Sequence, residues 1–220
     1  MDVRVDNATE NAKKQFDTIC ELIDGRETNG DFLTKVILTY VYIAMDNHES
    51  ICILVEREKY VSASSLSRPL VEASIRAMWL SLNENNKLVT YAINQLEKGK
   101  DKFPTFKIMF DMIDEHSDED KLTLGTRKEI KALHSYAHGG HFMISRCMTE
   151  DTIGTNFSSD EVIGMLRGAT YYMLLTLLAF ASKVGDKELA DKINKDIKSY
   201  LSLSFLNIRW SCSKPAGYTC

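Results

Sequence analysis

Residues 31–57, DFLTKVILTYVYIAMDNHESICILVER, give the clearest indication of the fold. Their apolar side chains recur at the spacing of an α-helix, and in the first half they cover nearly all of its sides. A helix that is apolar on every side is surrounded by other elements, so this stretch predicts the central helix of a core. Asp31 stands just before the apolar run and is expected to cap the helix. His48, which lies close to Asp46 and Glu49, is expected on the surface.

Helical spacing continues on both sides of this central stretch. The 220 residues contain only three prolines and eleven glycines, whereas an all-β chain carries a turn signal roughly every 8–12 residues. The pattern therefore predicts an all-α, single-domain helical bundle of six to eight helices within residues 1–206. Residues 207–220 change in composition and are expected to form a C-terminal tail. The expected helices cover about residues 6–24, 31–57, 60–82, 83–97, 104–115, 126–138, 159–184 and 186–203.

Average charge and cysteine usage exclude several classes of protein. Lysine and arginine total 27 against 31 aspartates and glutamates, which gives a net charge of −4 and a pI near 5.8. This balance excludes a strongly basic nucleic-acid-binding module but leaves room for a local basic patch. The five cysteines include no Cys-x-x-Cys pair, so a zinc ribbon or a thioredoxin-like site has no support.

Other features of the sequence predict a cytoplasmic protein without a cofactor. The first residues are polar and lack the apolar segment of a secretory signal. The most apolar stretches, residues 33–44 and 171–181, are shorter than the roughly 20 residues that cross a bilayer. The chain has no phosphate-binding glycine loop, no His-Glu-x-x-His and no Gly-x-Ser-x-Gly. We therefore expect no cofactor, no metal and no membrane partner.

Residues 127–141, RKEIKALHSYAHGGH, carry the first candidate site. At about 100° per residue, Arg127, Lys131, His134 and His138 fall on one face of a helix. His141 would join them, within an arc of roughly 80°, if the helix continued through the glycine pair. Two histidines on one face can divide acid and base roles near neutral pH, and a neighbouring arginine can hold a phosphate. This face is therefore the candidate catalytic surface.

Two other interpretations of the same residues stay open. The face could be an ordinary solvated one, on which protonated histidines favour the negative end of the helix dipole. His134, His138 and His141 could also hold a metal ion, although no carboxylate or cysteine adjoins them in the sequence.

A second charged stripe lies in SRPLVEASIRAMWL, residues 67–80. Arg68, Glu72 and Arg76 follow one another at four-residue steps between two apolar faces of the expected helix. The simplest interpretation is a ladder of ion pairs between neighbouring turns. The functional alternative is one wall of a cleft, in which Arg68 or Arg76 binds an anion and Glu72 orients the arginine.

Both segments carry a resemblance to a known superfamily. Arg127, six intervening residues and His134 fit the permissive Arg-x(4–6)-His motif of the HEPN superfamily of helical bundles. The pairing of SLSRPLVEASIRAMWL with a later SYAHGGH also resembles an HEPN-like bacterial and prophage family of similar length. The resemblance implies a metal-independent ribonuclease that acts as a toxin or phage-defence effector and forms a homodimer.

The resemblance also implies roles for individual residues. Arg127 would bind the scissile phosphate, and His134 would act as acid or base in a cleavage that leaves cyclic phosphate ends. A competing match makes His138 the functional histidine, with an arginine from residues 60–82 completing the site. The predicted catalytic residues are therefore Arg127, His134 and His138. The predicted substrate-binding residues are Arg68, Glu72, Arg76, Lys131 and His141.

The rival hypothesis is a non-catalytic protein, either a dimeric helical scaffold or an antitoxin-like partner of another protein. The acidic balance and the lack of a dense stripe of lysine and arginine favour it, because RNA binding depends on neutralising phosphates. The expected partners are thus RNA, a second copy of the chain, or a partner protein.

Overall fold

The computed structural model describes residues 2–25, 30–116, 123–148 and 153–202. Within these ranges the chain is helical, and its only strand-like feature is an isolated antiparallel bridge between Met148 and Ile153. The helices are α1 (Val3–Ile23), α2 (Phe32–Glu56), α3 (Tyr60–Leu82), α4 (Lys87–Leu96), α5 (Phe106–Asp114), α6 (Leu124–Ala137), α7 (His141–Cys147), α8 (Ser159–Val184) and α9 (Lys187–Ser202).

The all-α class is confirmed, but the described ranges hold nine helices where six to eight were expected. The additional helix is α7, which begins directly after the glycine pair that the sequence suggested as a stop. The Ser135 hydroxyl of α6 accepts the backbone N–H of Phe142 at 2.9 Å and so satisfies one of the free N–H groups in the first turn of α7. A contact from α6 thus supports the first turn of α7, and no local sequence pattern predicts it. The expected tail at 207–220 lies outside the described residues.

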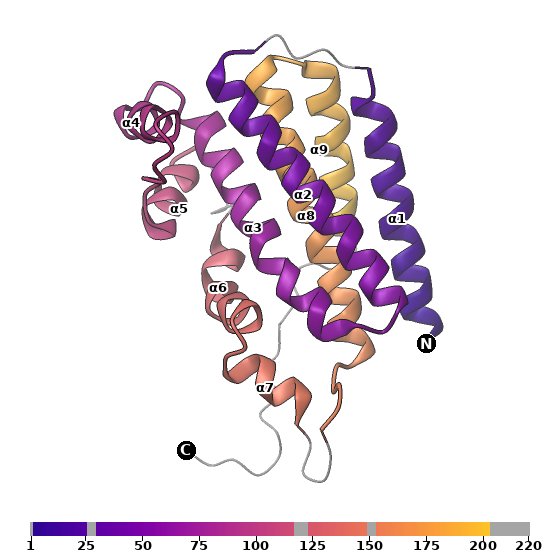
Figure 1. The fold of residues 1–220 in the computed structure, drawn as a ribbon. Coiled ribbons are helices and arrows are strands. Elements are labelled where there is room, and N and C mark those ends of the chain that lie inside the picture. Colours follow the sequence, from indigo (N-terminus) through magenta and orange to yellow (C-terminus); the bar gives the residue numbers. More distant parts are fainter. Residues whose placement is uncertain (1, 26–29, 117–122, 149–152, 203–220) are drawn as a thin grey trace.

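Three long helices, α2, α3 and α8, pack against one another in the middle of the bundle (Figure 1). Helices α1 and α9 lie beside α8, and α5 to α7 follow α3 on its other side. As predicted, α2 is central: Ile37, Ala44 and Ile51 along it are all 0% exposed. Its cap is also confirmed, because the Asp31 carboxylate accepts the N–H of Thr34 at 2.8 Å. This arrangement leaves α6 and α7 at one end of the molecule.

Helix α8 has the length and apolar content of a membrane-spanning helix. Of its most apolar window, however, 61% is buried inside the bundle, among α1, α2, α3 and α9. The apolar surface of α8 therefore belongs to the protein core. Ser158 and Glu161 form a capping box at its start, and Gly185, at a φ of 70°, ends it.

His48 is not on the surface of α2 as expected: it is 0% exposed, because α1 and α8 cover this side of the helix. Its ring stacks on Phe16 of α1, with 5.7 Å between the ring centroids. Its Nε2 lies 2.9 Å from the hydroxyl of Thr170 on α8. Because that hydroxyl donates its proton to the Leu166 carbonyl, the Thr170 oxygen accepts the N–H of His48. Nδ1 is buried without a hydrogen-bond partner among the described residues.

Acidification is expected to destabilise the fold through His48. Burial lowers the pKa of His48 from 6.5 to about 4. Its contribution to the unfolding free energy is therefore complete above pH 6.5, falls as the pH drops, and is reduced by about 3 kcal/mol below pH 4. Chemical denaturation of the wild type and of His48→Leu should show a larger loss of stability in the wild type on acidification. Equal losses in both proteins would contradict the prediction.

Candidate functional site

Helix α6 carries the first candidate site on its solvent side. Leu133 and Tyr136, 2% and 4% exposed, seat the helix against the bundle, and Ile130 packs on the main core cluster. Lys131 and His134, between these apolar positions, are exposed. Helix α6 is thus amphipathic, with an apolar side against the bundle and with Lys131 and His134 exposed.

The rings of His134 and His138 are neighbours, with 4.4 Å between their centroids. Both side chains are exposed, and Lys131 precedes them on the same face of α6. We call Lys131, His134 and His138 the histidine face. These side chains are therefore reachable by a large substrate, and the two imidazoles are close enough to touch the same reacting group.

A tight corner between α6 and α7 positions the histidine face. His138 is the C-cap of α6, and Gly139 adopts a left-handed conformation with a φ of 64°. The N–H of Gly140 donates to the carbonyl of Ser135 at 2.8 Å. A Cβ on Gly140 would lie 2.7 Å from the Ser135 hydroxyl, so only glycine fits without a shift. Glycine is thus favoured at 139 by the backbone conformation and at 140 by the closeness of the Ser135 side chain.

His141 does not join the histidine face. It is the first residue of α7, on the other side of the corner, and its ring centroid lies 5.8 Å from that of Phe142. Among the residues that the structure describes, no three His, Cys, Asp or Glu side chains gather as metal ligands. The alternative of a three-histidine metal site therefore has no geometric support.

Arg127, at the start of α6, is held against α5. Its guanidinium lies 2.9 Å from a carboxylate oxygen of Asp111 and 2.9 Å from one of Asp114. Its Nε donates to the hydroxyl of Thr123 at 2.8 Å, and its Cζ lies 5.1 Å from the ring centroid of Phe110. Arg127 shares a face with the histidines but lies about 10 Å before His134 along the helix axis. In this structure its charge joins α5 to α6.

Asp114 is the more buried of the two carboxylates that hold Arg127. Its side chain is 8% exposed, whereas that of Asp111 is 55% exposed. Burial by itself would raise the pKa of Asp114. Hydrogen bonds from the N–H and hydroxyl of Thr123 and from Arg127 outweigh burial and lower the pKa below 3.8. Asp114 therefore stays ionised at neutral pH.

Asp114→Ala is expected to lower the unfolding free energy by about 1–3 kcal/mol, because it leaves Arg127 and the Thr123 N–H without their buried partner. Asp111→Ala removes an exposed ion pair and should cost less than about 1 kcal/mol. The contribution of Asp114 is present above pH 3.8 and is lost as the pH falls through its lowered pKa. Urea denaturation at neutral pH compares the two variants. The opposite order of stability would refute this account.

The second charged stripe forms only half of the expected ladder. Arg68 donates from Nε to Glu72 at 2.6 Å, as the four-residue spacing predicts. Arg76 instead turns to other elements: it lies 3.4 Å from the Tyr40 hydroxyl and 3.7 Å from a carboxylate oxygen of Asp101. The side chains of Arg68, Glu72 and Arg76 are 17%, 27% and 25% exposed. The stripe is therefore half-buried, and it divides into an Arg68–Glu72 pair and a separate set of contacts around Arg76.

The two charged groups lie on helices that pack together. Ser65 precedes Arg68 by about one turn of α3. Its hydroxyl lies 3.3 Å from the carbonyl of Tyr136 on α6. Among the described residues, however, no hydrogen bond or ion pair joins Arg68, Glu72 or Arg76 to His134 or His138. Helices α3 and α6 thus pack together within one copy of the protein, but their charged side chains do not form one connected site.

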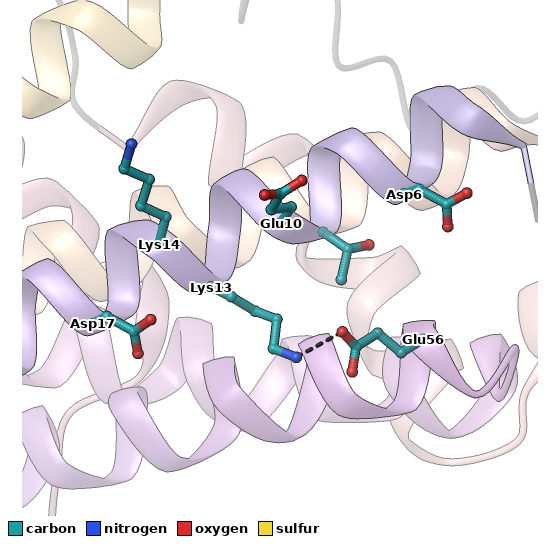
Figure 2. Close-up of a pocket in the computed structure, with 7 residues that line it drawn as sticks. Asp6, Glu10, Lys13, Lys14, Asp17 and Glu56 are labelled. Atoms are coloured by element: carbon teal, nitrogen blue, oxygen red, sulfur yellow. Dashed lines mark hydrogen bonds and ion pairs between the residues drawn. The ribbon is translucent and has the colours of Figure 1, made fainter.

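Figure 2 shows a different surface feature, an open groove of about 510 Å³ between α1 and the end of α2. Lys13 crosses it and donates to Glu56 at 2.6 Å. The side chains that line the groove carry charges of both signs, and none of them belongs to the sequence-predicted site. The lining residues are Asp6, Thr9, Glu10, Lys13, Lys14, Asp17 and Glu56.

Comparison with known proteins identifies a family for this architecture. The model of a family of unknown function, DUF6988, matches residues 41–203. The chain belongs to the DUF6988 family. The match includes all of α3 to α9, and therefore both charged groups of this DUF6988 protein, while α1 lies outside it. No curated protein and no solved structure matches the chain.

Sequence reasoning missed three residues that shape the site of this DUF6988 protein: Asp111, Asp114 and Ser135. Asp111 and Asp114 are three residues apart on an expected helix, a spacing that places two carboxylates on one side. Two neighbouring carboxylates indicate that a cationic side chain lies nearby, but the pattern does not show that this side chain is Arg127. Ser135 lies among the predicted site residues, and nothing in the sequence shows that its hydroxyl caps the next helix.

Proposed function

We propose that this DUF6988 protein is a cytoplasmic, metal-independent ribonuclease of the HEPN-like kind, acting as a toxin or phage-defence effector. The observation that carries the proposal is the exposed pair His134 and His138, with ring centroids 4.4 Å apart. Imidazole is the side chain best suited to donate and accept protons near neutral pH. Two of them on one rigid corner supply both proton transfers that cleavage of an RNA strand requires.

The proposed chemistry is a transfer within the RNA. One imidazole takes the proton of a ribose 2′-hydroxyl, and the oxygen attacks the adjacent phosphorus. The bond from phosphorus to the 5′-oxygen breaks, and the other imidazole donates a proton to that leaving oxygen. The products are a 2′,3′-cyclic phosphate and a 5′-hydroxyl, and no metal or redox partner takes part.

Two cationic side chains on the same helix as the histidines, Lys131 and Arg127, have different roles in this proposal. Lys131, exposed on the same face, is available to neutralise the scissile phosphate. The HEPN resemblance assigns that role to Arg127, whose guanidinium here contacts Asp111 and Asp114. We therefore propose that Arg127 holds α6 in position against α5, and that Lys131 contacts the phosphate.

The test is incubation of the purified protein with RNA in the presence of a chelator, followed by analysis of the fragment ends. The proposal expects chelator-resistant cleavage and fragments that carry cyclic phosphate and 5′-hydroxyl ends. Cleavage that the chelator abolishes, or fragments with 5′-phosphates, would overturn it. Expression in a bacterium gives a second readout, because toxicity should disappear in His134→Ala and His138→Ala.

A second candidate function is a non-catalytic, homodimeric scaffold or antitoxin-like partner. The observation that favours it is a set of exposed apolar side chains at the α7 end: Ile144, Met148 and Ile153 are 50%, 58% and 90% exposed. Exposed apolar residues that lie close together are typical of protein interfaces. Harmless expression, no RNA cleavage, and a dimer that Ile144→Ser dissociates would favour this function over the ribonuclease.

A further inference from the structure

The loop between α4 and α5 and the start of α5 carry a local excess of positive charge. Lys98, Lys100, Lys102 and Lys107 are all exposed, and we call these four residues the lysine strap. They outnumber the acidic residues of the same segment, Glu97 and Asp101, two to one, although the whole chain has a net charge of −4. The strap is thus a basic surface on an acidic protein.

The ammonium groups of the lysine strap are available to bind an anionic ligand from solution. Within the described part of the chain, none of the four makes an ion pair, whereas Lys13 and Lys183 each lie 2.6 Å from a glutamate oxygen. Asp101, the acidic residue between Lys100 and Lys102, is directed to Arg76 of α3 at 3.7 Å. The positive charge of the strap is therefore not neutralised by the carboxylate in its middle.

An aromatic anchor holds the strap to the bundle. The ring of Phe103 packs edge-on against Trp79 and Tyr40, with centroid distances of 5.9 and 6.3 Å. The guanidinium carbon of Arg76 lies 4.7 Å from the centroid of the same Phe103 ring. Because Phe103 is fixed in this way, the lysines extend from an ordered segment, and less entropy is lost when they bind a ligand.

The segment that carries the lysine strap and helix α6, which carries the histidine face, contact the same side of α3. Asp101, which lies between two lysines of the strap, contacts Arg76 of α3, and Tyr136 of α6 contacts Ser65 of α3. These two positions are separated by about 16 Å along the α3 axis and by only about 20° around it. Figure 1 shows α4, α5 and α6 following one another along this side of α3. One extended ligand can therefore reach both surfaces.

We propose that the lysine strap binds the phosphates of a single-stranded RNA whose scissile bond lies at the histidine face. The identity of the ligand as RNA rests on the proposed function. Each lysine that neutralises a phosphate releases condensed counterions, so binding through the strap weakens as salt rises. The strap adds phosphate contacts to the one assigned to Lys131 on α6.

The test is binding of a short fluorescent single-stranded RNA to the full-length protein carrying His138→Ala, which slows turnover. In this background Lys98→Gln, Lys100→Gln and Lys102→Gln are combined. The matched control combines Lys192→Gln, Lys195→Gln and Lys198→Gln, three exposed lysines of α9, with the same change of charge. We expect about tenfold weaker binding for the strap variant at low salt, and a salt dependence that is shallower by about two counterions. Binding by the control should be unchanged.

Equal weakening in both triple variants, or normal binding by the strap variant, would overturn the proposal. The experiments distinguish failure of the strap proposal from failure of the ribonuclease proposal. If the wild type cleaves RNA through His138 and the strap variant binds RNA normally, only the strap proposal fails. If RNA binds through the strap and the wild type does not cleave it, the strap stands and the ribonuclease fails.

Discussion

Replacing His138 with alanine is expected to lower the rate of RNA cleavage by about 10²–10⁴-fold, and His134→Ala by a similar factor. Each substitution removes one of the two imidazoles whose centroids lie 4.4 Å apart, so either proton donation or proton abstraction is lost. Both side chains are exposed, and neither substitution opens a cavity in the core. Cleavage of a fluorescent RNA under single-turnover conditions measures the effect.

The matched control for these two variants is His116→Ala. His116 is also exposed, and its Nε2 lies 3.2 Å from the side-chain oxygen of Asn83 at the end of α3. Its replacement should leave the cleavage rate unchanged. The assignment of the histidine face is wrong if both His134→Ala and His138→Ala cleave RNA at the wild-type rate, or if His116→Ala loses as much activity as they do.

Trp79→Ala is expected to lower the unfolding free energy by about 3–5 kcal/mol, the largest effect on stability that we predict. The Trp79 side chain is 0% exposed, and its indole N–H lies 3.2 Å from the sulfur of Met112 on α5. The same ring contacts Phe103, the anchor of the lysine strap. The substitution therefore removes apolar contacts from α3 and from the two elements packed on it.

Thermal and urea denaturation measure the effect of Trp79→Ala, with Tyr42→Ala as the control. Tyr42 is 70% exposed on α2, so its removal should change stability by no more than about 0.5 kcal/mol. Because Trp79 anchors Phe103, the variant should also weaken RNA binding by the strap under native conditions. A stability loss no larger than that of Tyr42→Ala would contradict the role of Trp79 in the core.

Helix positions were largely predictable because the signals are local. Apolar residues at helical spacing predict α2 and α8, and the cap at Asp31 follows from one side chain next to the helix that it starts. Helix α7 was not predictable, since its first turn depends on the Ser135 hydroxyl from the preceding helix. Helix α3 follows the expected range 60–82 and continues through Pro69.

The candidate site was predictable only in part. The spacing of His134 and His138 placed both on one face of α6, and the structure shows them as exposed neighbours. The same spacing grouped Arg127 with them, but spacing along a helix does not show which carboxylates a guanidinium meets. Asp111 and Asp114 come from α5, and they engage Arg127 because α5 and the start of α6 lie together.

Three features were predictable from local sequence alone, because helical periodicity and side-chain polarity act within a few turns of one helix: the all-α class, the central place of α2 and the basic face of α6. The packing of the helices instead determines that His48 is buried between α1 and α8, that Arg127 is paired, and that Phe103 fixes the lysine strap on α3. Each of these depends on which helices become neighbours. That choice follows from how the apolar faces of the whole bundle pack together, and no local stretch of sequence carries it.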